Sequence, residues 1–236
     1  MRVVTLLPSA TETLRAWGLD PIACTRFCEQ PDLPTVGGTK DPDVAAIVAL
    51  APDLVVVDEE ENRREDADAL AAAGVRVFVT AVRAVADVAP TLRALADAVG
   101  LDPPLTLLGA LKPTYGPERA QNGDGTVRAF VPIWRRPWMT INGDTYGSSL
   151  LDAIGVANVY ADAPVRYPEA DLGDVRARAP GVVLAPSEPY PFTARHEPEL
   201  ATIAPVRFVD GRDLFWWGVR TPAAIERLQA QLSSEA

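Results

Sequence analysis

Two halves of this sequence repeat the same pattern of small, apolar and turn-forming residues. The matched pairs are residues 51–57 (APDLVVV) with 179–185 (APGVVLA), 73–79 (AGVRVFV) with 204–210 (APVRFVD), and 12–18 (ETLRAWG) with 149–155 (SLLDAIG). The pairs keep their order in both copies. A repeat this long indicates two similar domains rather than a solenoid of short units.

Within the first copy, short apolar runs alternate with helical patterns. The predicted strands cover residues 3–7, 22–25, 54–57 and 76–79, and the predicted helices cover 9–17, 43–50, 62–73 and 84–99. Ser9 is predicted to cap the first helix, with Glu12 completing a capping box. Strands that alternate with helices predict a parallel sheet covered on both faces.

The middle of the chain separates the two copies. Residues 101–125 are rich in proline and glycine and predict a linker, with a short helix over residues 105–111. We therefore expect an N-terminal α/β lobe over residues 1–83, a connecting helix and linker over 84–125, and a C-terminal α/β lobe over 126–236. Since ligands bind beyond the carboxyl ends of parallel strands, we also expect a ligand cleft between the lobes.

Charge and composition exclude several classes of partner. The formal net charge is −10, and the sequence pI is about 4.6. Such an acidic chain is repelled by nucleic-acid phosphates and by anionic membranes, so neither is an expected partner. No apolar run approaches membrane-spanning length. As the sequence stands we expect a cytoplasmic protein, or an extracytoplasmic one if a leader has been removed.

Motifs for catalysis and metal binding are missing from the sequence. It contains no G-x-S-x-G, Walker A or G-x-G-x-x-G pattern, so no catalytic residue is assigned. Cys24 and Cys28 lack the partners of a zinc site, and a bridge between them stays open. His196, the only histidine, is predicted to be an exposed polar residue. The acids at 58–61 are predicted to form a solvated loop that caps the following helix.

Loops that follow the predicted strands supply the candidate ligand contacts. The loops of the second half are rich in aromatic residues, which in loops usually cover a ligand, a partner or one another. The predicted contacts are Ser9, Phe27, Cys28, Lys40, Glu60, Glu61, Asn62, Trp134, Arg135, Trp138, Tyr146, Arg166, Tyr167, Glu188, Tyr190, Trp216 and Trp217.

Several of these segments also carry a family resemblance. The sequences LLPSATE (6–12), VGGTKDPD (36–43), IVALAPDLVV (47–56), GDTYGSSLLDAIGVANV (143–159) and ARAPGVVL (177–184) resemble those of the class III periplasmic binding proteins. This helical-backbone metal receptor superfamily serves ABC importers and includes binders of vitamin B12, haem and siderophores. The resemblance covers nearly the whole chain apart from the linker.

The resemblance implies two lobes joined by a rigid helix, shortened here, with a ligand in the cleft and an ABC permease as partner. Only Glu65 matches the position of the family's importer-docking glutamate in the N-terminal lobe. A single histidine disfavours the metal-ion branch. The expected ligand is a corrinoid first, and haem or a ferric siderophore second; no further cofactor is required.

Two other functions stay open on the sequence. One is a cytosolic cofactor-handling protein or enzyme on the same scaffold, which would use Cys28 and the acidic loop. The other is an interaction module that has lost its small ligand, which the short linker suggests.

Overall fold

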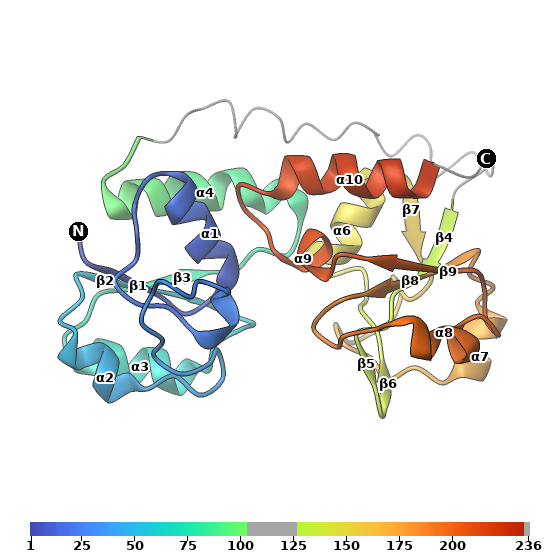
Figure 1. The fold of residues 1–236 in the computed structure, drawn as a ribbon, viewed down its shortest axis with the longest axis horizontal. Helices are drawn as coiled ribbons and strands as arrows, with labels where there is room; N and C mark the ends of the chain where they lie inside the picture. The colour runs from blue at the N-terminus through green and yellow to red at the C-terminus, as the bar shows by residue number, and fades with distance from the viewer. Residues whose placement is uncertain (103–126, 234–236) are drawn as a thin grey trace. The chain divides into compact units, whose positions relative to one another are not determined.

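The computed structural model describes residues 1–102 and 127–233. These residues form two compact units (Figure 1). One unit holds Met1–Val82 and continues from Ala86; the other holds Arg83–Val85 and the described residues from Val127 onward. Most of the predicted linker and all of its predicted helix lie outside the described residues, so the predicted domain boundaries stay predictions. Among the residues described, no helix has the length and apolar character needed to cross a membrane.

The first unit is built on a parallel sheet in the order β1-β2-β3. Its strands are β1 (Val3–Thr5), β2 (Leu54–Asp58) and β3 (Val77–Thr80). The strand predicted over residues 22–25 is reduced to two isolated parallel bridges, Val4 with Ala23 and Cys24 with Thr35. All five residues of β2 are buried, which explains its uninterrupted apolar run.

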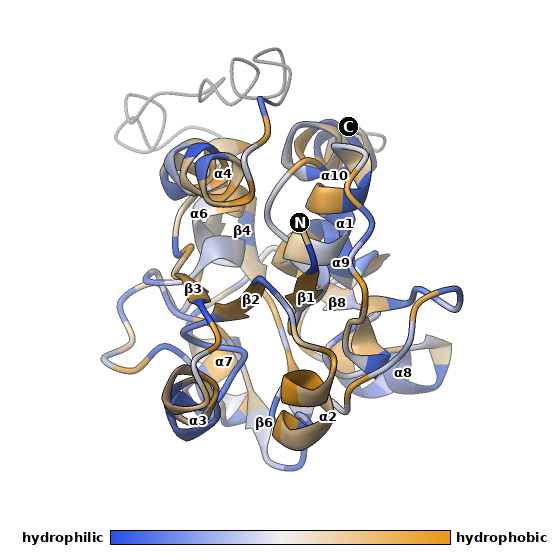
Figure 2. Cartoon of the chain, turned by 90° about the vertical axis from the view of Figure 1, so that its left-hand side faces the viewer, coloured by the Kyte–Doolittle hydropathy of each residue, from blue (hydrophilic) through white to orange (hydrophobic). Residues whose placement is uncertain are grey.

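Helices cover this first sheet. They are α1 (Pro8–Ala16), the 3-10 turn η1 (Arg26–Cys28), α2 (Val44–Ala49), α3 (Arg64–Ala72) and α4 (Val85–Val99). The core that joins sheet and helices includes Val4, Leu6, Ile47, Val55 and Leu70. Figure 2 shows apolar residues on β1 to β3 and on α2 of the first unit.

The predicted start of α1 is wrong. The helix begins at Pro8, and Leu7 is the N-cap, without a side-chain cap hydrogen bond. Proline suits the first helical position because it lacks an N–H group, which would have no partner there. Ser9 therefore lies inside the helix and is buried.

The second unit is built on a parallel sheet in the order β7-β4-β8-β9. The strands of this unit are β4 (Val127–Phe130), β7 (Val156–Asn158), β8 (Val182–Pro186) and β9 (Val206–Val209), with a hairpin of β5 (Trp134–Arg135) and β6 (Trp138–Met139). Its helices are α6 (Tyr146–Ala153), α7 (Leu172–Ala177), η2 (Ala194–His196), α8 (Glu197–Leu200), α9 (Gly211–Phe215) and α10 (Thr221–Ser233). The prediction of two similar α/β lobes is confirmed.

The sequence repeat is also a repeat of structure. Strands β4-β8-β9 are paired as β1-β2-β3 are, and all these pairs are parallel. Strands β2 and β8 are each buried over five residues. The edge strands β3 and β9 share one burial pattern, with a single exposed residue in third place, Val79 and Phe208.

Even a polar contact of the helix-to-strand turn is repeated. Arg2 donates to the carbonyls of Leu50 (2.6 Å) and Ala51 (3.3 Å) after α2. Arg128 donates in the same way to the carbonyls of Arg178 (2.8 Å) and Ala179 (3.4 Å) after α7. Both arginines therefore satisfy carbonyls left over at a helix C-terminus.

Candidate functional site

In each unit, the predicted contacts gather on loops at the carboxyl ends of the parallel strands. The segments that follow β2, β4, β8 and β9, short helices and the β5–β6 hairpin included, carry most of them. Twelve of the predicted side chains are exposed or half-buried: Phe27, Lys40, Glu60, Glu61, Trp134, Arg135, Trp138, Arg166, Tyr167, Glu188, Tyr190 and Trp216. The other five are buried: Ser9, Cys28, Asn62, Tyr146 and Trp217.

The acidic loop after β2 is organised by a buried carboxylate. Asp58 Oδ1 accepts hydrogen bonds from the backbone N–H groups of Glu60 (2.9 Å) and Glu61 (3.3 Å), and Oδ2 accepts one from Thr80 Oγ1 (2.7 Å). Burial raises the pKa of Asp58, against the opposing effect of these hydrogen bonds. The predicted capping role is wrong, because the N-cap of α3 is Arg63, without a side-chain cap hydrogen bond.

Asn62 holds the same loop from its other end. Its Oδ1 accepts from the Asp58 N–H (2.7 Å), and its Nδ2 donates to the carbonyls of Leu6 (3.1 Å) and Thr39 (2.9 Å). The side chain is 7% exposed. Asn62 was predicted to contact ligand, but its hydrogen-bonding groups are used within the first unit.

Lys40 and Glu61 are two exposed charged residues of this loop region. Lys40 Nζ donates to the carbonyl of Glu60. The Glu61 side chain is exposed, yet its pKa is raised, first by partial desolvation and then by the Asp58 carboxylate. Both effects favour the neutral form of the Glu61 carboxyl group.

Cys28 lies in a buried polar cluster. Its Sγ is 3.2 Å from the hydroxyl oxygens of both Thr11 and Thr25, and the side chain is 1% exposed. The hydrogen bond with Cys24 lowers the pKa of Cys28; those of Thr11 and Thr25 act in the same direction, against burial. Both cysteines are free thiols. Cys28 therefore cannot present its thiol to a ligand without movement of η1.

In the second unit, five rings from the β5–β6 hairpin and from the segment between β8 and α8 form one group, the aromatic cluster: Trp134, Trp138, Tyr190, Phe192 and His196. Trp134 meets Tyr190 edge-on at 5.5 Å, and Trp138 stacks on Phe192 at 5.9 Å. Tyr190 and Phe192 each pack against His196 at 5.4 Å. Strands β4 and β8 are neighbours, so their carboxyl-end loops meet at the same edge. Trp134 is 46% exposed and offers its ring to solvent.

Arg135 lies against the aromatic cluster at Trp138 and forms an ion pair with Glu199. Its Nη2 and Nε donate to Glu199 Oε2 at 2.8 and 3.1 Å, and its guanidinium lies 5.9 Å from the Trp138 ring. Arg135 was predicted to contact ligand; within the second unit it interacts with Glu199 and also with Tyr190, and both raise its pKa.

The prediction that His196 is exposed is wrong. The side chain is 2% exposed. Its Nδ1 accepts a hydrogen bond from the Thr193 backbone N–H (3.0 Å), and its Nε2 lies 3.3 Å from the Tyr190 hydroxyl. Burial lowers the pKa of His196, and the charges of Arg195 and Arg135 lower it further. Thr193 and His196 have the spacing of a capping box. This spacing is the sequence signal from which the position of His196 could have been predicted.

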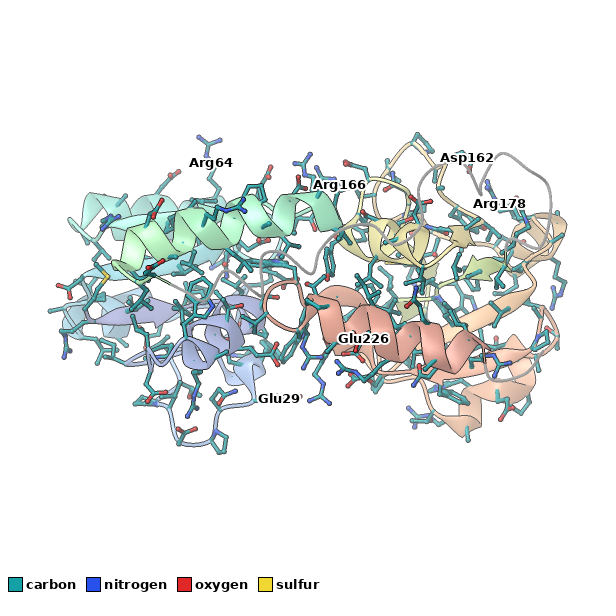
Figure 3. All side chains as sticks on the ribbon, turned by 90° about the horizontal axis from the view of Figure 1, so that it is seen from above. Glu29, Arg64, Asp162, Arg166, Arg178 and Glu226 are labelled. Carbon is teal, nitrogen blue, oxygen red and sulfur yellow. The ribbon has the colours of Figure 1, made fainter. Side chains whose placement is uncertain are left out.

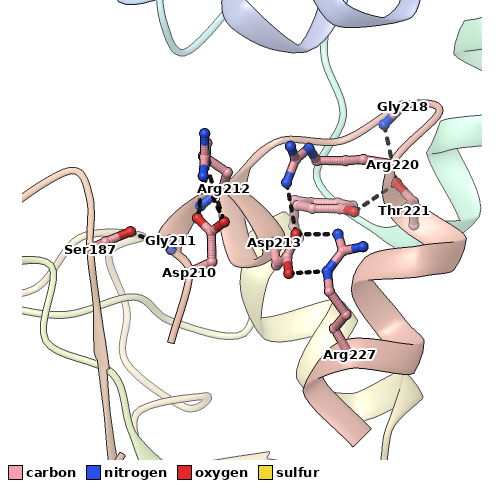
Figure 4. A network of polar contacts seen from close by, with 10 residues as sticks. Ser187, Asp210, Gly211, Arg212, Asp213, Gly218, Arg220, Thr221 and Arg227 are labelled. Atoms are coloured by element: carbon pink, nitrogen blue, oxygen red, sulfur yellow. Dashed lines mark hydrogen bonds and ion pairs between the residues drawn. The ribbon is translucent and has the colours of Figure 1, made fainter. Parts of the chain in front are cut away.

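Helix α9, which follows β9, carries the buried Asp213 at the centre of a charge network (Figure 4). Asp213 Oδ1 accepts from Arg220 (2.7 Å) and Arg227 (2.6 Å), and Oδ2 also accepts from Arg227 (2.7 Å). Beside it, the hydroxyls of Tyr146 and Thr221 share a hydrogen bond of 2.8 Å. Burial raises the pKa of Tyr146. Tyr146 was predicted to contact ligand, but the structure packs it inside the second unit.

The two adjacent tryptophans that follow α9 differ in exposure. Trp217 is 5% exposed and belongs to the core. Trp216 is half-buried, and the guanidiniums of Arg212 and Arg220 lie 6.0 and 5.3 Å from its ring. Adjacent side chains point in different directions, so only Trp216 stays a candidate contact.

Two further ion pairs of the second unit involve no residue of the aromatic cluster. Arg166 donates to Asp144 Oδ2 (2.9 Å). Arg178 donates to Asp162 (2.9 Å), and both are labelled in Figure 3 together with Arg166. A cavity of about 270 Å³ is lined by Arg128, Asn158, Val159, Ala161, Asp162 and Arg178, none of them a predicted contact. In the described part of the chain, no three His, Cys, Asp or Glu side chains are grouped to hold a metal ion.

Two α/β units of repeated topology, with polar and aromatic loops at the carboxyl ends of their strands, define a class of two-lobed binding proteins. A family model described as "Periplasmic binding protein" matches residues 3–102. With the relatives and folds below, this match shows that the chain is similar to the class III periplasmic binding proteins.

The relatives are binding proteins with a named ligand. The chain is 28% identical to the vitamin B12-binding protein of Salmonella choleraesuis (strain SC-B67) over 195 residues, 78% of this chain and 71% of the relative. It is also 28% identical to that of Vibrio parahaemolyticus over 210 residues, 83% and 71% of the two chains.

Solved structures share the fold. The periplasmic vitamin B12 binding protein BtuF of Vibrio cholerae has a TM-score of 0.76 at 20% identity, covering 98% of this chain and 96% of its own. The periplasmic haem-binding protein BhuT in complex with two haems has a TM-score of 0.81 at 22% identity, covering 98% and 97%. At these identities the similarity shows the fold alone.

Proposed function

We propose that this chain is the substrate-binding protein of an ABC importer and that it binds a metal chelate, with a corrinoid as the first candidate. The observation that carries the proposal is the aromatic cluster, which brings Trp134, Trp138 and Tyr190 together at the carboxyl end of the second sheet. Broad, rigid rings suit the faces of a large planar or macrocyclic ligand.

A corrinoid ranks first because the relatives that match most of this chain are named vitamin B12-binding proteins. Haem ranks second, since several structural neighbours are named for haem and Tyr190 offers a phenol oxygen beside the exposed ring of Trp134. A ferric siderophore ranks with haem. An enzyme that uses Cys28 is less favoured, because that thiol is buried.

Importer docking and location follow from the same proposal. Glu65, which is exposed in the first turn of α3, is the candidate docking carboxylate. Structural neighbours are named as periplasmic, which supports an extracytoplasmic site of action. An ABC permease is then the expected partner.

The direct test is quenching of tryptophan fluorescence by cyanocobalamin, haemin and a ferric siderophore. We expect saturable quenching by one of the three. Trp17→Phe is the matched control, since Trp17 ends α1 in the first unit and is not a predicted contact; it should lower the starting signal and leave the affinity unchanged. Absence of saturable quenching by all three probes would contradict the proposal.

A further inference from the structure

We propose that His196 is a positioning residue: while its imidazole is neutral it holds Tyr190 and the loop after β8 in the ligand-binding arrangement, and protonation releases them. The inference rests on the proposed function only for its effect on ligand affinity. It is carried by the burial of the ring and by the three polar groups around its two nitrogens.

Those three groups fix one tautomer. The Thr193 N–H donates to Nδ1 (3.0 Å), while Arg195 Nε (3.1 Å) and the Tyr190 hydroxyl (3.3 Å) both approach Nε2. A neutral imidazole has one donor and one acceptor. The Thr193 N–H is fixed in a capping box, whereas the Arg195 side chain is exposed and free to turn. Nδ1 is therefore the acceptor, and Nε2–H donates to Tyr190.

This tautomer orients the phenol. Because Tyr190 Oη accepts from Nε2–H, its own proton is directed away from His196, toward an acceptor on a ligand. Tyr190 also meets Trp134 edge-on and packs against Phe192 at 4.8 Å. Holding Tyr190 thus holds the exposed part of the aromatic cluster.

Protonation breaks this arrangement. A proton on Nδ1 would face the Thr193 N–H, so two donors would meet and the capping box would open. The charged and titratable groups that face the ring are Arg195 on its own turn, Arg135 from β5, Glu199 from α8 and Tyr190. The two arginines oppose the added positive charge, Arg135 is already paired with Glu199, and burial opposes it as well.

The sequence makes the first measurement unusually direct. His196 is the only histidine, so a long-range ¹H–¹⁵N spectrum of the full chain contains one imidazole. We expect the proton on Nε2, a pKa below 6.5, and a Thr193 amide shift that titrates with the same midpoint. A proton on Nδ1, or a pKa at or above 6.5, would overturn the inference. Neither result depends on a ligand.

The second measurement uses the probe, cyanocobalamin or haemin, that quenches tryptophan fluorescence. We expect the wild-type affinity to fall about fivefold between a pH about one unit above the His196 pKa found in the first measurement and a pH about one unit below it, the loss of roughly one hydrogen bond. In His196→Asn, the amide oxygen can still accept from Thr193 but cannot be protonated, so its affinity should be the same at both pH values. An equal fall in wild type and variant would overturn the inference.

Tyr190→Phe separates the two contacts of the ring. It keeps the packing and removes the phenol oxygen, so the imidazole should stay the Nε2–H tautomer that Thr193 dictates. A change of tautomer would show that Tyr190, not Thr193, sets it and would contradict the proposed order of control. If no probe binds, the proposed function fails, while the spectra still decide whether His196 holds the loop.

Discussion

At the scale of residues, Asp58 shows how a buried charge can be tolerated at the end of a parallel strand. Its two oxygens accept from two backbone N–H groups and from Thr80, which partly offset the cost of burial. Thr80 Oγ1 also lies 3.1 Å from the carbonyl of Val57, and one hydroxyl proton cannot serve both acceptors. The Thr80 hydroxyl therefore donates to only one of these two acceptors at a time.

Asp58→Asn should consequently be neutral or stabilising by up to about 1 kcal/mol. Asparagine Oδ1 keeps the backbone N–H groups, and its Nδ2 donates to Thr80, whose proton then serves Val57. The raised pKa of Asp58 gives the direction: ionisation is disfavoured in the folded state, so the advantage of the variant grows as pH rises through that pKa. Urea unfolding at acidic and neutral pH measures it.

The matched comparison is Asp58→Ala, which removes both acceptors. It should destabilise by about 2 kcal/mol, because buried donors lose their partners. A variant Asp58→Asn as unstable as Asp58→Ala would contradict the account of the loop.

At the scale of elements, the two helix-to-strand turns repeat a strained residue. Ala51 and Ala179 have φ angles of 46° and 49°, in the left-handed region, and each directly precedes a proline. Their carbonyls accept from Arg2 and Arg128. A left-handed alanine is costly because its Cβ crowds the following carbonyl.

Ala51→Gly and Ala179→Gly should each stabilise the chain by about 0.5–1 kcal/mol, the relief of strain less the entropy of glycine. The control is Ala71→Gly, inside α3, which should destabilise by about 1 kcal/mol. The free energy of unfolding in urea compares the three. If both turn variants were less stable than wild type, the proposed backbone strain at Ala51 and Ala179 would be contradicted.

The two tryptophans of the β5–β6 hairpin are expected to differ in role, Trp134 in ligand binding and Trp138 in stability. Trp134 is exposed at one end of the aromatic cluster, while Trp138 stacks on the buried Phe192. We expect Trp134→Ala to weaken chelate binding about tenfold with a stability loss below about 1 kcal/mol. Trp138→Ala should instead cost about 2–3 kcal/mol of stability. Isothermal titration and urea unfolding of both variants distinguish these outcomes; unchanged affinity in Trp134→Ala would remove that ring from the proposed site.

At the scale of the whole molecule, the net charge predicts how the association rate of a charged ligand depends on salt concentration. With a formal charge of −10, the chain repels an anionic chelate such as haemin, and salt screens that repulsion. The association rate of haemin should therefore rise about twofold or more between low and physiological salt. That of cyanocobalamin, which carries no net charge, should stay constant. Stopped-flow quenching measures both rates, and a fall in the haemin rate with salt would indicate local basic steering instead.

The sequence by itself determined the two-lobed α/β architecture. Buried parallel strands such as β2 and β8 need uninterrupted apolar runs, and helices need their own period, so both are visible in local order. The duplicated APDLVVV pattern then predicts the duplicated sheet. The position of Trp134 and Tyr190 on carboxyl-end loops follows from the same reading.

Only the tertiary structure decided which polar side chains of those loops are available to a ligand. Asn62 is buried by partners at Leu6 and Thr39, and His196 by rings from the loop that precedes it. Whether a polar side chain faces solvent depends on hydrogen-bond partners that folding brings from elsewhere in the chain. Local periodicity does not encode those partners, and so the sequence alone placed His196 outside and Asn62 at the ligand.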